Sequence, residues 1–146
     1  MVTAVEIIQV FNPPLLEAYY QLRFEVLRKP WHQTFDSTMD STESISHHFI
    51  GLLNNQVVAT GRLEPIKEKV FQVRSMAVHP QYQRQGIGEQ MLEYLEKFSL
   101  AKGMLKIELD ARENALNFYK KCGYATTEKS YLLFNEIQHF KMEKWL

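Results

Sequence analysis

Hydrophobic residues recur along this chain at two spacings, and each spacing predicts one kind of element. From residue 15 to 27 they return every three or four positions, which is the pattern of an amphipathic helix, and Asn12 can cap its first turn. The pattern returns over 87–102, and Gly103 follows at the position where many helices end. A shorter helix is predicted over 114–122. Each of these helices has an apolar side to pack on a core.

Strand-like runs fill most of the remaining chain. Asn54 and Asn55 separate two of these runs, and Asn tolerates the positive φ of a tight hairpin turn. Residues 31–46 form a polar stretch, which is expected to be a mobile loop with one helical turn, and 65–69 is expected to be a charged turn. The predicted strands cover residues 5–10, 48–53, 56–63, 71–78, 104–110, 124–134 and 139–145. This order predicts a single α/β domain over 1–146, with a mixed sheet and helices on both faces.

A loop with two glycines joins the strand at 71–78 to the helix at 87–102. Gly86 and Gly88 lack a Cβ, so the backbone can turn sharply there and a ligand can approach it closely. The first amides of the helix have no partner within the helix, and they point into the same space. Such amides, at the positive end of a helix, bind anions. The pattern predicts a phosphate or pyrophosphate site.

Three interpretations of this loop compete before the rest of the chain is considered. A P-loop needs Lys and then Ser or Thr after its last glycine, whereas Glu89 follows Gly88 here. A dinucleotide fingerprint needs a small residue where Met91 stands, although Asp110 lies at a suitable distance for a ribose contact. Three consecutive antiparallel strands also precede the loop, and a Rossmann domain alternates strands and helices. A turn without a ligand is the remaining alternative for two glycines alone.

Composition narrows the class of protein. Among 146 residues, 17 Lys and Arg balance 17 Asp and Glu, so no overall field attracts nucleic acid or an anionic membrane. Cys122 is the only cysteine, and the five histidines lack metal-ligand spacing. The first residues lack the pattern of a signal peptide. We therefore expect a cytoplasmic protein with no bound metal, no nucleic-acid partner and no membrane partner.

Two motifs resemble those of the GCN5-related N-acetyltransferases. Residues 83–88, QRQGIG, resemble the family signature Q/R-x-x-G-x-G/A. Residues 114–124 resemble its N-x-x-A-x-x-F-Y-x-x-x-G-F/Y segment, with the alanine shifted in register. The ending at 136–142 is similar to the I-x-H-x-x-M ending of ElaA-like and YjcF-like proteins. The resemblance implies a mixed, mostly antiparallel sheet of about seven strands and acetyl-CoA as the cofactor.

The resemblance also implies where that cofactor binds. A bulge near Met76 and Ala77 would separate their strand from its parallel neighbour, and the pantetheine arm would pair there like another strand. The pyrophosphate would bind to backbone amides of the glycine loop. The residues implied in cofactor binding are Met76, Ala77, Val78, Gln83, Arg84, Gln85, Gly86, Ile87, Gly88, Glu89, Asn114, Asn117, Tyr119 and Lys120.

The implied reaction is direct acetyl transfer to a primary amine in a ternary complex. The amide of Val78 would polarise the thioester carbonyl, and Tyr119 would protonate the departing sulfur. The general base stays open among Glu64, His48 and Glu43. Cys122 and His139 are expected to be structural.

The acceptor and the partners are less constrained by the sequence. Asp36, Asp40 and Glu43 lie in the polar stretch 31–46 and suggest a cationic amine on a small molecule or peptide, although a solvated loop explains them equally well. The aromatic strands at the end of the chain could pair in a homodimer. A catalytically silent acyl-CoA-binding module is the alternative function.

Overall fold

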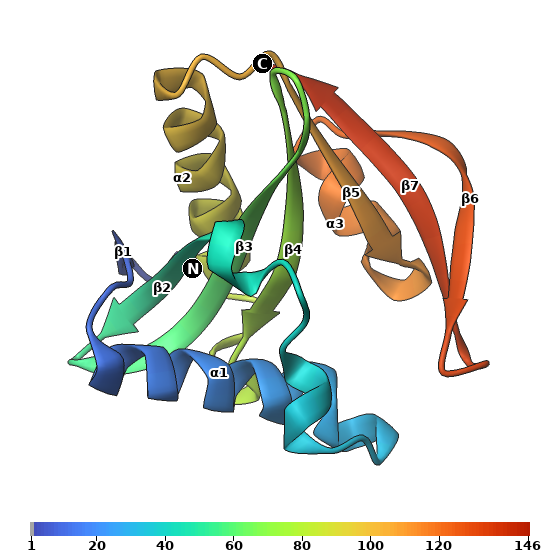
Figure 1. Ribbon diagram of the computed structural model, residues 1–146. Helices are drawn as coiled ribbons and strands as arrows, with labels where there is room; N and C mark the ends of the chain where they lie inside the picture. Colours follow the sequence, from blue (N-terminus) through green and yellow to red (C-terminus); the bar gives the residue numbers. More distant parts are fainter. Residues whose placement is uncertain (1) are drawn as a thin grey trace.

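A seven-stranded sheet forms the centre of the computed structural model, which describes residues 2–146 (Figure 1). Its strand order is β1-β2-β3-β4-β5-β7-β6, and β4 and β5 are the parallel pair among antiparallel neighbours. The mixed, mostly antiparallel sheet is therefore confirmed. The strands are β1 (Glu6–Gln9), β2 (His47–Leu53), β3 (Gln56–Lys67), β4 (Val70–Val78), β5 (Lys106–Arg112), β6 (Ala125–Leu133) and β7 (Ile137–Trp145).

Three helices cover the two faces of this sheet, as expected. They are α1 (Pro13–Leu27), α2 (Ile87–Ala101) and α3 (Leu116–Lys121). Alternating side chains of β2 enter different cores: Phe49 packs with the residues of α2 and α3, and Ile50 packs with those of α1. At Gly61 a Cβ atom would lie 2.9 Å from the sulfur of Met91, so glycine lets β3 pass close to α2.

Local signals in the sequence act as expected at the ends of elements. The side chain of Asn12 accepts a hydrogen bond from the amide of Leu15 at 3.1 Å and caps α1. Asn54 and Asn55 both have positive φ, 50° and 63°, so they form the tight hairpin turn. Gly103 has a φ of 81° and follows α2. These features depend on neighbouring residues, which is why the sequence reveals them.

The predicted charged turn at 65–69 is shorter in the structure. Strand β3 continues through Pro65 to Lys67 and pairs with β4 along this part. Pairing between β3 and β2 ends at Leu63. Pro65 therefore lies beyond β2, where its lack of an N–H leaves no carbonyl of β2 without a donor. The turn is left with residues 68 and 69.

The segment 31–46 is more ordered than the mobile loop expected. It contains the 3₁₀ segments Phe35–Thr38 and Glu43–Ile45, and it begins at the last residue of a third, Lys29–Trp31. The fully buried guanidinium of Arg62 donates to both carboxylate oxygens of Asp40, at 2.9 and 3.0 Å, and to Glu43 at 2.8 Å. Arg23 donates to the same Glu43 at 2.7 and 3.0 Å. These ion pairs fasten the loop to β3 and α1.

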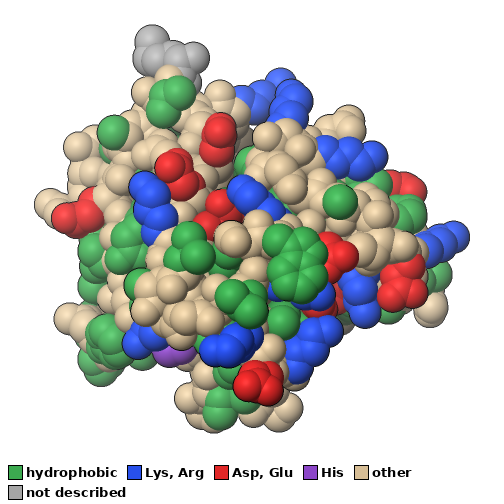
Figure 2. All heavy atoms as spheres, turned by 90° about the horizontal axis from the view of Figure 1, so that it is seen from above, with side chains coloured by type: hydrophobic (Ala, Val, Ile, Leu, Met, Phe, Trp, Pro, Cys, Tyr) green, Lys and Arg blue, Asp and Glu red, His purple; other side chains and the backbone are tan. Residues whose placement is uncertain are grey.

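The surface is mixed in charge. Figure 2 shows Lys and Arg side chains interspersed with Asp and Glu over the face seen from above, with no large area of one sign. Within residues 2–146, no helix combines the length and the apolar character needed to cross a bilayer. This distribution agrees with a net charge of zero spread over the whole chain.

Candidate active site

Strands β4 and β5 separate partway along their length. They pair only from Val70 to Val73 and from Lys106 to Leu109, and beyond these residues they diverge (Figure 1). The cause is a bulge in β4, because two steps along β3, from Thr60 to Arg62, oppose three steps along β4. The opening that the family resemblance implied is therefore present.

A strained residue and one hydrogen bond define this bulge. Ser75 has a φ of 52°, which is unusual for a residue other than glycine. The hydroxyl of Thr60 donates to the carbonyl of Ser75 at 2.7 Å and satisfies an oxygen that the sheet leaves unpaired. The bulge lies at Ser75 and Met76, one position before the expected one.

The backbone of Val78 faces the opening. The amide of His79 donates to Val58 in β3 at 2.8 Å, so strand alternation turns the amide and carbonyl of Val78 to the other side. The side chain of Gln83 donates to that carbonyl at 3.1 Å. Both backbone groups of Val78 can thus pair with an extended ligand once Gln83 moves aside.

The glycine loop has the geometry of an anion site. Arg84 and Gly86 adopt positive φ, 63° and 78°, and Gly86 is the residue before the first turn of α2. Alternation of left-handed and right-handed residues turns successive amides towards one concave side. The amide of Thr3 donates to Gln85 at 2.9 Å, and Gln90 donates to Thr3 at 2.6 Å, so the N-terminal segment supports the loop.

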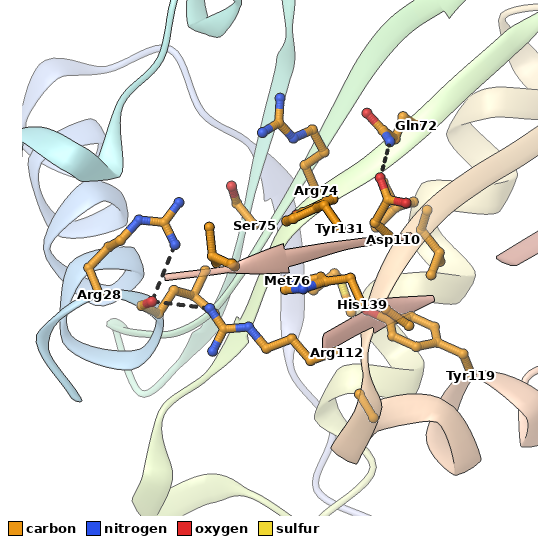
Figure 3. A pocket seen from close by; sticks show the side chains of 16 residues that line it. Arg28, Gln72, Arg74, Ser75, Met76, Asp110, Arg112, Tyr119, Tyr131 and His139 are labelled. Atoms are coloured by element: carbon orange, nitrogen blue, oxygen red, sulfur yellow. Dashed lines mark hydrogen bonds between the residues drawn. The ribbon is translucent and has the colours of Figure 1, made fainter. Parts of the chain in front are cut away.

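A cavity of about 470 Å³ lies where β4 and β5 diverge (Figure 3). The end of α1 lines it from one face of the sheet, and Tyr119 of α3 lines it from the other. This volume suits a small molecule. The side chains labelled in Figure 3 are Arg28, Gln72, Arg74, Ser75, Met76, Asp110, Arg112, Tyr119, Tyr131 and His139.

Tyr119 holds a protonated hydroxyl at the wall of this cavity. Its ring packs edge-on against Tyr124 and Phe118. Burial raises the pKa of the phenol above its ordinary value, so the proton stays on the oxygen at neutral pH. Within residues 2–146 the hydroxyl makes no hydrogen bond, and Figure 3 shows the side chain of Tyr119 pointing from α3 towards the cavity.

His139 presents a free basic nitrogen in the same cavity. Its Nδ1 lies 3.0 Å from the carbonyl oxygen of Ile137, and a carbonyl only accepts, so Nδ1 carries the proton. Burial lowers the pKa of the imidazole and outweighs the hydrogen bond to Ile137, which raises it; Arg112 and Arg28 lower the pKa further, and Asp110 raises it. The ring is therefore neutral at pH 7 and Nε2 has a lone pair. Tyr131 stacks on the ring with a centroid separation of 4.3 Å and fixes its plane.

Charges of opposite sign lie in different parts of the cavity. The carboxylate of Asp110 accepts hydrogen bonds from Gln72 at 3.0 Å and from Ser130 at 2.7 Å. Figure 3 shows this carboxylate at one end and the guanidinium groups of Arg28 and Arg112 at the other. The cavity can thus orient a polar small molecule.

The structure brings together only part of the predicted site. Met76 and Tyr119 line the cavity, and the loop at 83–89 lies outside its lining. Asn114, Asn117 and Lys120 are exposed on and before α3, with side chains free to meet a ligand.

The residues considered as general base lie elsewhere. Glu43 and Glu64 pair with arginines, and both ring nitrogens of His48 are engaged, with the hydroxyl of Tyr19 at 2.7 Å and the carbonyl of Glu43 at 2.8 Å. His139, which was expected to be structural, lines the cavity. The one feature of the sequence that could have pointed to His139 as a site residue is its place in the ending at 136–142.

Comparisons with known proteins agree with this geometry. The family model described as the acetyltransferase (GNAT) family matches residues 7–124. The chain belongs to this family, and it is an acetyl-CoA-dependent N-acetyltransferase.

Individual relatives and solved structures match nearly the whole chain. The uncharacterized N-acetyltransferase YjcF of Bacillus subtilis (strain 168) is 28% identical over 130 residues, which are 89% of this chain and 91% of that protein. An acyl-CoA N-acyltransferase from Pseudomonas aeruginosa has a TM-score of 0.84 at 20% identity, covering 97% and 99% of the two chains. A GNAT family acetyltransferase from Elizabethkingia anophelis, solved with acetyl-CoA bound, has a TM-score of 0.76 at 16% identity, covering 97% and 98%.

Proposed function

We propose that this protein transfers the acetyl group of acetyl-CoA directly to a primary amine of a small molecule or peptide, in a ternary complex. The observation that carries the proposal is the opening between β4 and β5. This opening lies next to the end of β4 and leads to a cavity lined by Met76, Tyr119 and His139, which supports the use of the Val78 amide. A thioester carbonyl bound to the Val78 amide would have its acetyl group directed towards this cavity.

The residues around the opening suit acetyl-CoA. Met76, Ala77 and Val78 would pair with the pantetheine arm along the side of β4 that β5 leaves free. The loop from Gln83 to Glu89 would hold the pyrophosphate with its amides. Asn114, Asn117 and Lys120, all exposed near α3, would contact other polar parts of the cofactor.

Three groups of the protein would carry the chemistry. Bound acetyl-CoA supplies an acetyl group whose carbonyl carbon the amine attacks. The amide of Val78 would donate a hydrogen bond to the carbonyl oxygen as negative charge develops there. Nε2 of His139 would accept the proton of the attacking amine. As the new C–N bond forms and the C–S bond breaks, Tyr119 would donate its proton to the sulfur, and the proton on His139 would later return to Tyr119 through water.

Two measurements on the purified protein test this function. Acetyl-CoA at a hundred times its dissociation constant is expected to stabilise the fold by about 2.7 kcal/mol, which a thermal-shift titration detects, whereas NAD and ATP should not. Primary amines should then stimulate thiol release from acetyl-CoA. Binding without stimulation by any amine would favour the silent acyl-CoA-binding module, and no binding would overturn both functions.

A further inference from the structure

Arg28 and Arg112 place two positive charges side by side in the cavity. Arg28 Nη1 donates to the carbonyl oxygen of Leu27 at 3.3 Å, and Arg112 Nη2 donates to the same oxygen at 3.1 Å. Figure 3 shows both guanidinium groups converging on this oxygen at the end of α1. Two cations held around one neutral acceptor repel each other and need a further partner.

The protein supplies no anion for this pair. The remaining contact of Arg28 is a donation to the carbonyl of Ser37 at 3.1 Å, and its guanidinium also lies over the ring of Phe134. Within residues 2–146, neither Arg28 nor Arg112 has a carboxylate in salt-bridge range. Burial lowers the pKa of both side chains, and for Arg112 the nearby charge of Arg28 lowers it further.

The other arginines of this region show the contrast. Arg74 also lines the cavity, but its guanidinium pairs with Asp40 at 3.3 Å and with Glu64 at 3.5 Å. Arg62 and Arg23 pair with carboxylates as well. Only Arg28 and Arg112, among the described arginines that line the cavity, keep an uncompensated charge.

We propose that Arg28 and Arg112 form a subsite for an anionic group of the acceptor, so that the substrate is an amine that also carries a carboxylate or a phosphate. This inference rests on the proposed function and names the substrate class of the same cavity. A guanidinium presents a planar fork of donors that matches either anion. An arriving anion would relieve the repulsion between the two cations, and the amine would lie deeper, towards His139 and Tyr119.

This assignment differs from the cationic acceptor that the acidic segment 31–46 suggested. Asp40 and Glu43 are engaged by Arg62 and Arg23, and no residue of that segment lines the cavity. The charge that meets the acceptor at this end is therefore positive. Spacing in the sequence could not show which acidic residues were already paired.

Matched pairs of amines test the subsite. An α-amino acid is compared with its carboxamide, and ethanolamine phosphate with ethanolamine, by amine-stimulated thiol release from acetyl-CoA. We expect the wild-type protein to prefer one anionic member at least tenfold in kcat/KM, and the pair that shows the preference distinguishes carboxylate from phosphate. Equal rates within both pairs would overturn the proposal.

Variants connect the preference to the two arginines. Arg28→Gln and Arg112→Gln should raise KM for the anionic amine about tenfold or more, since hydrogen bonds between charged groups are lost, and should change KM for the neutral analogue far less. Arg112→Lys keeps the positive charge but lacks the planar fork of donors, so its KM for the anionic amine should lie between those of the wild type and Arg112→Gln. Lys97→Gln, which removes an exposed charge on α2, is the control. Equal losses for both amines would contradict the subsite.

A binding measurement keeps the test independent of turnover. Inorganic phosphate, titrated calorimetrically or followed by NMR, should bind saturably to the wild-type protein and not to the folded Arg28→Gln/Arg112→Gln double variant. Acetyl-CoA binding should be equal in both. Phosphate binding that survives in the double variant, or no binding to the wild type, would overturn the subsite. If the wild-type protein does not bind acetyl-CoA, the proposed function itself is overturned.

Discussion

At the scale of single residues, Tyr119 offers the sharpest test of the chemistry. Tyr119→Phe removes the hydroxyl that opens into the cavity and keeps the buried ring. We expect kcat to fall about a hundredfold or more, the usual contribution of a general acid, with little change in acetyl-CoA affinity. The melting temperature should stay nearly constant because the hydroxyl makes no hydrogen bond within the described chain. Steady-state kinetics and calorimetry measure these effects.

Tyr94→Phe is the control for this substitution. Tyr94 is a partly exposed tyrosine of α2, its ring packs edge-on against Phe49, and it does not line the cavity. Its loss should leave kcat unchanged. Equal losses of kcat and cofactor affinity in Tyr119→Phe would mean that the hydroxyl only holds the cofactor.

His139 predicts a distinct dependence of activity on pH. Burial holds its pKa below the ordinary imidazole value, so the free Nε2 is available at neutral pH and is lost only at acidic pH. We expect kcat/KM to fall in that range, and His139→Gln to lower kcat/KM about a hundredfold and to abolish the acidic limb. The separate change in kcat/KM that comes from titration of the acceptor's own amine should appear in both the wild-type protein and His139→Gln.

His32→Asn serves as the comparison, because His32 is exposed and has a left-handed backbone that asparagine tolerates. It should keep the wild-type pH profile. An acidic limb that persists unchanged in His139→Gln would assign it to another group and remove His139 from the mechanism.

At the scale of elements, the two ends of α2 provide a matched pair of substitutions. Gly86 precedes the helix and Gly103 follows it, with φ of 78° and 81°, so a side chain strains the backbone at either position. Gly86→Glu adds bulk and negative charge at the loop proposed for the pyrophosphate. We expect it to abolish acetyl-CoA binding, whereas Gly103→Glu, with nothing within 4 Å of its Cβ, should bind normally.

Calorimetric titration of both folded variants with acetyl-CoA measures this difference. Both variants should lose comparable stability, which denaturation by urea reports. If Gly86→Glu binds acetyl-CoA as tightly as Gly103→Glu does, the pyrophosphate is held elsewhere and the assignment of the loop is wrong.

At the scale of the whole molecule, three partly or fully buried histidines predict how stability depends on pH. Burial lowers the pKa of His47, His48 and His139 in the folded protein. In the unfolded chain these histidines titrate near 6.5. Below this pH the unfolded state therefore binds more protons than the folded state does. The free energy of unfolding should therefore fall as the pH drops below 6.5, by at most about 1.4 kcal/mol per pH unit for each histidine.

A second loss is expected at lower pH. The hydrogen bonds from Arg62 hold the pKa of Asp40 well below its usual range. Burial alone would raise the pKa of Glu43, but Arg23 and Arg62 outweigh it and lower the pKa. Stability from these carboxylates is present above about pH 4 and is lost as they protonate. Urea denaturation from pH 8 to pH 3 measures both steps, and a flat profile between pH 7 and pH 5 would contradict the histidine prediction.

Most of the fold could be predicted because its signals are local. The helix cap at Asn12, the turn at Asn54 and Asn55 and the glycine after α2 each act within a few residues. The position of the bulge was inferred from family resemblance, since its cause is a contact between Thr60 and Ser75 in different strands.

The sequence by itself determined the elements, the family motifs and the loop that suits a pyrophosphate, because hydrophobic periodicity and turn preferences depend on residues that are close together in the chain. Only the tertiary structure decided which charges meet. It paired Asp40 and Glu43 with buried arginines, and it brought His139 to the same cavity as Tyr119. It also left Arg28 and Arg112 together without an anion. These partners are far apart along the chain, and whether a charge is compensated depends on the atoms around it in space.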